Sequence, residues 1–535
     1  MNTRHYITEK SLCGPSDPYP CGPCQKLTQM DKKIHKAAIA LAALKQERQR
    51  LQQQAHQKHT HEPFIYQLPS EIVSAIFELC LLNQRTPLAL STVCRTWRNI
   101  AYSTPQLWEK LSLQWGLERP PTPSLVKKWI GRASECLLNI RFSVANIRFN
   151  QETADSIIQI IDILNQRSHL WKNLTYDGPL GFLPNFSSGN QNLSQLRTLD
   201  IRSCSQYDGR PLDLCCRPLL RLSIASLNPT LAMTTDSNCI NLIHLKLEDV
   251  LISDCIEALR RAHNLEKCIL QRPRRDGIND LQSPPPIIES KIRYLELIDD
   301  GDLYHILAYL TCSSLKNLVI NRSSITICTV ELPVVAEFLR RSGCLLEDFS
   351  LLNPETSYSS NYDDDSINDL PDFNTFASLY REMPALEHLR LSFVFPMSTR
   401  HVFAPLTEFS MVNGEQRPQC LPSLRSLTLH VQTWNEEASE WQIFPYIFGT
   451  RSSGHTMDVH RPLLQSISLD FDTIFHPYFS RSGIDEESMK AILWLRDAAG
   501  VNWKITESYY CDLLAVEVER YRRKGTADSP TVTSS

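Results

Sequence analysis

The chain has 535 residues, of which 42% are hydrophobic and 21% are charged. At roughly 100–200 residues per domain, this length suggests about three domains, and the composition excludes a largely disordered chain. The formal net charge of −4 gives no case for binding nucleic acid or an anionic membrane.

Seventeen cysteines are scattered along the chain, and many stand within apolar runs, as Cys80, Cys268 and Cys344 do. This distribution is typical of small buried hydrophobic residues in a reducing compartment and not of a disulfide framework. Residues 1–10 lack the apolar core of a signal peptide, and no run reaches the roughly 18 apolar residues that span a bilayer. We therefore expect a cytoplasmic or nuclear protein with no membrane contact.

The N-terminal part divides into an irregular segment, 1–25, and a helical segment, 26–62. Four prolines, Pro15, Pro18, Pro20 and Pro23, forbid a helix in the first segment. In the second, helix-forming residues carry an apolar stripe at a spacing of three to four, which Arg48 interrupts. The stripe consists of Ile34, Ala37, Leu41, Leu44, Leu51 and Ala55. A short coiled coil and a solvated helix both fit this pattern.

Residues 64–112 form a compact helical block. Leu68-Pro69-Ser70-Glu71 is typical of a helix start, because proline suits the first turn and an acidic side chain suits the positive helix end. The sequence predicts a second helix over Pro87–Trp97 and a third near Arg98–Ser103, which Pro105 ends.

From about residue 125 to 480 an apolar-x-x-apolar-x-apolar pattern recurs, as in Leu196-Arg-Thr-Leu199-Asp-Ile201. Successive copies start at 171, 196, 219, 242, 265, 292 and 315, and wider gaps then lead to 346, 386, 424 and 464. The regular spacing is within the range of leucine-rich repeats. Each unit is expected to be a short strand with a return behind it, and neighbouring units must stack to bury their apolar faces. The wider gaps predict loop insertions, including an acidic stretch at 362–372.

The expected fold is therefore α/β: an N-terminal helix, a three-helix module and an irregular solenoid of short parallel strands with returning helices. The predicted returning helices are Ser253–Ala262, Asp302–Leu310, Val334–Arg341 and Phe373–Glu382. Residues 484–523 are expected to cap the solenoid as helix, strand and helix over Ile484–Ala498, Val501–Ile505 and Glu507–Arg522. Residues 524–535 are small and polar and are expected to be a disordered tail.

The helical block resembles the F-box. The matching residues are Leu68-Pro69, Glu71-Ile72 and Ile76-Phe77, then Leu90, Val93, Cys94, Arg95, Trp97, Arg98, Ile100 and Ala101, and finally Pro105, Leu107 and Trp108. With a helix before it and irregular leucine-rich repeats after it, the chain resembles the large fungal, basidiomycete-type group of F-box proteins. The asparagine or cysteine expected after each repeat strand is clear only at Cys204, which predicts an uneven solenoid.

This resemblance implies a substrate-recognition subunit of an SCF (Skp–cullin–F-box) ubiquitin ligase. The F-box would bind the adaptor subunit and, through it, the cullin, while the repeat body would bind a protein substrate. The implied adaptor-binding residues are Leu68, Pro69, Ile72, Ile76, Val93, Cys94, Trp97, Leu107 and Trp108. Some of them would instead form the core of the module, since so short a helical unit needs one. The alternative is a scaffolding repeat protein whose F-box-like helices only cap the solenoid.

No pattern of catalytic residues stands out, and we expect neither an enzyme nor a cofactor. A Gly-rich phosphate loop, a His-Glu-x-x-His motif and a Gly-x-Ser-x-Gly motif are all missing from the sequence. Cys13, Cys21 and Cys24 with His35 are the best zinc candidates, but a second close pair is missing and incidental cysteines fit better. Asp363–Asp365 is interpreted as an exposed insertion or as a contact for a basic partner.

Overall fold

The computed structural model describes most of the chain, in two compact units, Met1–Cys80 and Leu81–Ser535. The described residues are 21–58, 68–116, 120–144, 150–186, 193, 195–203, 219–226, 241–274, 287–299, 304–322, 331–352, 373–393, 402–413, 415–431, 446–448, 463–471, 486–497, 499–507, 511–512, 514–516 and 518–521. The acidic stretch, the tail from 524 and Cys204 lie outside these residues. No described helix is long and apolar enough to cross a membrane.

The first unit contains two helices, α1 (Gly22–Lys58) and α2 (Ser70–Leu79). The prediction that 1–25 is irregular was wrong at its end, because α1 already begins at Gly22. Pro23 does not prevent this, since a proline in the first turn lacks only an N–H that has no partner within the helix. Over 22–54 the side chains of α1 are exposed, except that Cys24 is half-buried.

The second unit begins with a group of short helices, α3 (Arg85–Val93), α4 (Arg95–Ser103) and the 3-10 helix η2 (Pro105–Trp108). The prediction of one helix over Pro87–Trp97 was wrong, because the helix ends at Val93 and a new helix begins after Cys94. That residue is extended, with φ −157° and ψ 176°, and its thiol accepts the N–H of Trp97 at 3.4 Å. A cysteine thus caps a new helix where the sequence suggested a continuous one.

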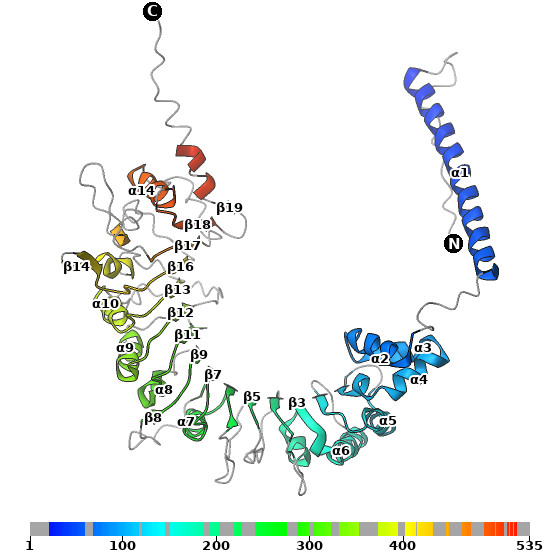
Figure 1. Ribbon diagram of the computed structural model, residues 1–535, viewed down its shortest axis with the longest axis horizontal. Helices are drawn as coiled ribbons and strands as arrows, with labels where there is room; N and C mark the ends of the chain where they lie inside the picture. The colour runs from blue at the N-terminus through cyan, green and yellow to red at the C-terminus, as the bar shows by residue number, and fades with distance from the viewer. Residues whose placement is uncertain are drawn as a thin grey trace, which may run out of the picture. The chain divides into compact units, whose positions relative to one another are not determined.

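After these helices in the chain, fifteen strands among the described residues form one sheet, along which the chain runs from the first strand to the last (Figure 1). Fourteen of them run parallel, in chain order, and each pairs with its neighbours in that order. These strands are β1 (Lys110–Gln114), β2 (Leu138–Ser143), β3 (Trp171–Asp177), β4 (Thr198–Ser203), β5 (Arg221–Ser226), β6 (His244–Glu248), β7 (Lys267–Gln271), β9 (Tyr294–Asp299), β11 (Asn317–Arg322), β12 (Asp348–Leu352), β13 (His388–Phe393), β16 (Ser426–Val431), β17 (Ser466–Phe471) and β18 (Asn502–Glu507). The expected parallel strands are confirmed.

The recurring apolar pattern explains the register of this sheet. In β1 and from β4 to β18, the second and fourth residues of each parallel strand of this sheet are buried, as Leu245 and Leu247 of β6 are, and they pair in register with the equivalent residues of β5 and β7. Adjacent strands thereby align their apolar residues into two continuous columns. Each fully buried leucine contributes about 1.5–3 kcal/mol through burial. In β2 the first, third and fifth residues are buried instead, and in β3 the first, fourth and sixth. In the strands whose second and fourth residues are buried, the first, third and fifth positions face away from this core, and we call them the open face.

Helices line the buried side of the sheet. They are α5 (Pro123–Ala133), α6 (Gln151–Asn165), α7 (Ile252–Arg261), α8 (Tyr304–Tyr309), α9 (Glu331–Ser342) and α10 (Phe373–Arg381). Figure 1 shows α7 to α10 along one side of the strands, and α8 packs on α9 as α9 packs on α10. Helices α7 to α10 each begin and end within three residues of a helix predicted from the sequence. Helices α5 and α6 were not predicted.

Smaller elements lie in the connections between successive main strands. Two-residue strands β8 (Ile288–Glu289) and β10 (Leu310–Thr311) pair in parallel. A hairpin of β14 (Phe409–Val412) and β15 (Glu415–Pro418) occupies part of one of the wide gaps in the repeat spacing. Short 3-10 helices are η3 (Ser168–Leu170), η4 (Leu180–Phe186) and η7 (Ala404–Thr407).

The C-terminal end differs from the predicted cap. After α14 (Glu486–Asp497), β18 continues the parallel sheet instead of standing apart from it. The predicted helix Glu507–Arg522 was wrong at its start, because Glu507 ends β18 and β19 (Cys511–Asp512) follows. This last strand turns back and pairs with β18 in antiparallel fashion.

Candidate functional site

The first group of predicted contact residues lies at the start of α2. Pro69 precedes the helix with φ −52° and ψ 146°, and its carbonyl accepts the N–H groups of Ile72 and Val73. Pro69 is exposed and Leu68 is half-buried. Because proline fixes its own φ, the entry to this helix is rigid and keeps both side chains at its N-terminal end.

Along α2, the apolar residues separate into a buried and an exposed set. Val73 and Phe77 are 2% and 1% exposed, one helical turn apart, and form the side that is buried. Ile72 is 49% exposed, and Ile76 is half-buried. Two of the predicted contact residues are therefore accessible on a helix whose other side is buried.

A second group lies where α3 meets α4. Val93 ends α3 with 58% of its surface exposed, while Cys94 and Trp97 are half-buried. The corner is held by the cap that Cys94 makes and by Arg98, whose Nε donates to the carbonyl of Ser91 at 2.9 Å. Capping gives Cys94 a structural role that its position in the sequence motif did not reveal.

Leu107 and Trp108, the last predicted contact residues, lie instead in the core. They are 1% and 0% exposed. The indole N–H of Trp108 donates to the carbonyl of Ala101, and the indole N–H of Trp129 on α5 donates to the carbonyl of Trp108, both at 2.8 Å. The two indole rings meet edge to face at 4.8 Å. The sequence left open whether a motif residue contacts the adaptor or forms the core of the module. Leu107 and Trp108 belong to the core, since a partner cannot reach them.

Each of the two units carries exposed apolar side chains that the sequence motif did not single out. On α2, Leu79 is 87% exposed. In the second unit, Leu82, Leu88 and Tyr102 are 90%, 39% and 38% exposed. The excess of apolar residues around α2 was a usable signal, because a ten-residue helix that is apolar on most sides cannot bury all of them. Such residues mark interaction surfaces when they cluster.

A row of basic side chains crosses the open face at the first position of three adjacent strands. Arg221, His244 and Lys267 are register neighbours on β5, β6 and β7. Partial burial, reinforced by the positive charges of Arg221 and Lys267, lowers the pKa of His244. The Nζ of Lys267 also lies 4.2 Å from the centre of the Tyr294 ring. Burial and a hydrogen bond to Glu296 raise the pKa of that tyrosine to about 12.

Beside this row, a shallow groove of about 460 Å³ runs along the turns that lead into β5, β6, β7, β9 and β11. Its lining combines apolar, amide and charged side chains: Leu220, Asn241, Ile243, Asn264, Glu266, Lys291, Arg293 and Ser314. Lys291 and Arg293 outnumber Glu266 here, so the groove and the row share an excess of positive charge.

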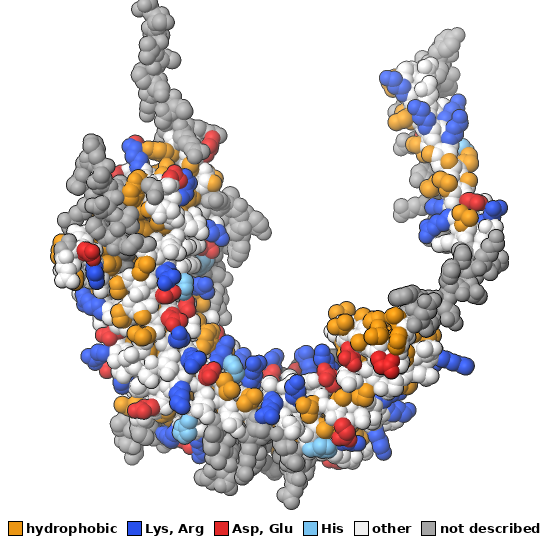
Figure 2. Space-filling model, viewed as in Figure 1, with side chains coloured by type: hydrophobic (Ala, Val, Ile, Leu, Met, Phe, Trp, Pro, Cys, Tyr) orange, Lys and Arg blue, Asp and Glu red, His pale blue; other side chains and the backbone are white. Residues whose placement is uncertain are grey.

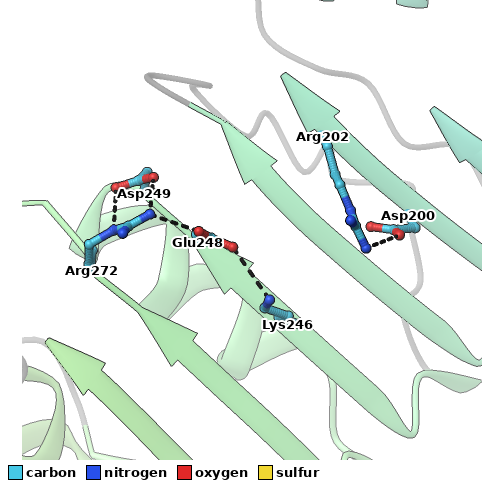
Figure 3. A network of polar contacts seen from close by, with 6 residues as sticks. All are labelled: Asp200, Arg202, Lys246, Glu248, Asp249 and Arg272. Carbon is cyan, nitrogen blue, oxygen red and sulfur yellow. Dashed lines mark hydrogen bonds and ion pairs between the residues drawn. The ribbon is translucent and has the colours of Figure 1, made fainter. Parts of the chain in front are cut away.

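At the opposite end of the same strands, charged residues of both signs form a network (Figure 3). Arg272 binds both carboxylate oxygens of Asp249, at 3.2 and 3.1 Å, and its Nη2 lies 2.7 Å from Glu248. Asp249 and Arg272 have positive φ angles of 56° and 45°, a conformation that costs a non-glycine residue about 1–3 kcal/mol. The paired side chains hold these strained ends of β6 and β7 together.

The cysteines follow the expected pattern only in part. Cys255, Cys268, Cys312 and Cys344 are buried, and burial raises the pKa of the Cys268, Cys312 and Cys344 thiols. Cys80, expected to be buried, is exposed. Of the zinc candidates, Cys13 lies outside the described residues. Among the residues that are described, no group of three His, Cys, Asp or Glu side chains is placed to hold a metal ion.

Comparison with protein families matches residues 65–114 to the F-box-like family. The matched segment contains all the predicted contact residues, from Leu68 to Trp108, and ends with β1. F-box domains generally bind Skp-type adaptor subunits in SCF complexes. None of the curated proteins compared with the chain matches it. The chain thus carries an F-box-like segment followed by a long parallel sheet of short strands.

Proposed function

We propose that the chain is a substrate-recognition subunit of an SCF-type ubiquitin ligase and is not itself an enzyme. The observation that carries this proposal is the F-box-like match at 65–114, together with accessible apolar residues in that segment. Docking of an apolar helix surface on a partner groove is a common mode of recognition. The adaptor would in turn connect the chain to the cullin.

The residues proposed to contact the adaptor are those of the motif that remain accessible. They are Leu68, Pro69, Ile72, Ile76, Val93 and Trp97. Exposed Leu79 and Leu82 add apolar surface beyond the motif. Leu107 and Trp108 are assigned to the core, and Cys94 to the cap of α4.

The long sheet is proposed to be an irregular leucine-rich-repeat body of the kind found in fungal F-box proteins, with a protein substrate bound on its open face. The periodic strands and the paired buried columns support this proposal. Repeat arrays present long continuous surfaces of this kind to their partners. The positive charges of Arg221 and Lys267, with the groove next to them, favour substrate segments of net negative charge.

Replacing Leu68 and Pro69 together with alanine is expected to lower binding to the purified adaptor subunit at least about tenfold, because anchor residues of an interface typically cost more than about 1 kcal/mol when truncated. Binding would be measured by titration with the full chain, and circular dichroism would confirm that the fold is kept. Unchanged adaptor affinity would refute the F-box assignment.

A matched control comes from α5, which also starts with a proline followed closely by an exposed leucine. Pro123→Ala with Leu125→Ala removes the same residue types at another helix start, where Leu125 is 48% exposed. This control is expected to bind the adaptor as the wild type does. Equal losses in both variants would indicate general destabilisation rather than a lost contact.

The second candidate function is a scaffolding protein whose F-box-like helices only cap the repeat body. The contact between Trp108 and Trp129 favours it, because it joins the helical segment to the first helix behind the sheet. Adaptor titration separates the two functions, since a pure cap would have no affinity for the adaptor in any variant.

A further inference from the structure

Helix α1 carries an apolar stripe that is longer than the sequence motif suggested. Because the helix begins at Gly22, Leu27 and Met30 extend the three-to-four spacing toward the N-terminus. The stripe comprises Leu27, Met30, Ile34, Ala37, Leu41, Leu44 and Leu51, and its large side chains are 53–68% exposed. At about 1.5 Å per residue it is about 36 Å long. Figure 2 shows hydrophobic side chains along α1 with Lys and Arg between them.

We propose that a second copy of the chain binds this stripe in antiparallel orientation, so that two α1 helices form a coiled coil and the protein is a homodimer. The proposal does not depend on the function proposed above. It rests on the order of side-chain sizes and charges along α1. When a second α1 runs in the opposite direction, large side chains meet large or small ones that fit them, and opposite charges meet.

The apolar residues match first. In an antiparallel pair centred on residue 39, Leu27 faces Leu51 of the second copy, and Ile34 faces its Leu44. At the centre, Ala37 faces the second copy's Leu41, so that a small side chain lies opposite a large one. Alanines at positions 38 and 40 flank the seam at this centre, which allows the two helices to approach closely.

Arg48, which interrupts the stripe, also favours the antiparallel orientation over the parallel one. In the antiparallel register it lies opposite Met30 of the second copy, where its aliphatic stem can cover the thioether while the guanidinium reaches water. In a parallel pair it would face Arg48 of the second copy, and two like charges would meet inside the apolar seam.

The charged residues beside the seam give the strongest argument. In antiparallel coiled coils, equivalent flanking positions of the two helices lie next to each other. In α1 that geometry brings Asp31 next to Lys45 of the second copy, and Lys33 next to its Glu47. Symmetry repeats both pairs. A parallel pair would keep one favourable contact, Asp31 with Lys26 of the second copy, but would set Lys33 and Lys45 beside alanines, at positions 38 and 40. The contact of Glu47 with Arg50 in its own helix, at 3.5 Å, is exposed and does not compete strongly.

The mass of the full chain in solution tests the proposal, measured by analytical ultracentrifugation over a range of concentrations. The wild type is expected to dimerise. Leu41→Lys is expected to weaken the dimer at least about a hundredfold, since two buried leucines are lost per dimer. Ile39→Lys is the matched control, because Ile39 is 57% exposed against 53% for Leu41 but lies off the stripe. This control should dimerise like the wild type.

Charge reversal tests the orientation. Lys45→Glu places like charges beside Asp31 twice per dimer and is expected to weaken association roughly tenfold. Adding Asp31→Lys should restore it. In a parallel dimer the single change would be silent, and the double variant would be weaker because the lysine introduced at position 31 would meet Lys26 of the second copy. A monomeric wild type, a higher oligomer, or failure of the double variant to recover would each overturn the proposal. Both lysine and glutamate favour helices, so circular dichroism should show α1 intact.

Discussion

Replacing Trp108 with alanine is expected to lower the free energy of unfolding of the helical segment by about 3–5 kcal/mol, the usual cost of removing a large buried aromatic side chain. The indole is fully buried, meets Tyr102 and Trp129 edge to face, and lies 4.6 Å from the guanidinium of Arg132. Its loss also leaves the Ala101 carbonyl without the indole donor. The hydrogen bond from Trp129 should remain, because it ends on the backbone of residue 108.

Hydrogen exchange over residues 85–133 is the suitable measurement, since a chain of this size need not unfold in one step. Trp97→Ala is the matched control: it is also a tryptophan of the F-box-like segment, but it is half-buried and proposed to contact the adaptor. We expect Trp97→Ala to keep the protection and lose adaptor affinity, and Trp108→Ala to lose the protection. Wild-type protection in Trp108→Ala would show that this core is not needed.

Leu318→Ala is expected to destabilise the middle of the sheet by about 2–5 kcal/mol. Leu318 is fully buried on β11, and its register neighbours Leu295 and Phe349 are fully buried as well. A cavity at this position therefore removes packing contacts from the same apolar column on both neighbouring strands. Because each repeat contacts mainly its neighbours, the protection of backbone amides from hydrogen exchange should fall most in β9, β11 and β12.

Val319→Ala provides the control on the same strand. Val319 is the next residue, points to the open face and is half-buried. Its truncation should cost less than about 1.5 kcal/mol, because little cavity forms at a partly exposed site. Denaturant unfolding of the two variants, with hydrogen exchange to locate the loss, compares the faces directly. Equal costs would contradict the two-faced arrangement of the strands.

The repeated strands were predictable because their signal is local and repeats many times. Two leucine-type residues separated by one position, as in Leu245 and Leu247, define a strand with one buried face, and the spacing between copies defines the stack. Strand β1 was missed, because the helical block was taken to end at residue 112 and the repeats to begin near 125. Helix α6 had a visible signal that went unused: Asn150 caps it, and Ile157, Ile161 and Leu164 lie on one face.

The candidate contact residues were harder to predict, because a motif identifies positions without saying which way they face. Ile72 and Trp108 belong to the same motif, yet one is 49% exposed and the other fully buried. The difference depends on α5, which lies outside the motif and supplies Trp129. Similarly, the helix break at Cys94 depends on a thiol acting as a cap, a role more common for serine, threonine, asparagine or aspartate. Both the burial of Trp108 and the helix break at Cys94 therefore depend on contacts that the motif itself does not specify.

The reversal of the chain at β19 has a consequence for the sheet as a whole. A parallel array of this kind has no intrinsic length, because the last strand offers the same row of N–H and C=O groups that every earlier strand offered to its successor. Strand β19 pairs with the final residues of β18, at Thr506 and Glu507, in the opposite direction. An incoming parallel strand from another molecule would have to displace it. The short reversed strand thus covers the edge of β18 at Thr506 and Glu507, where a further parallel strand would otherwise pair.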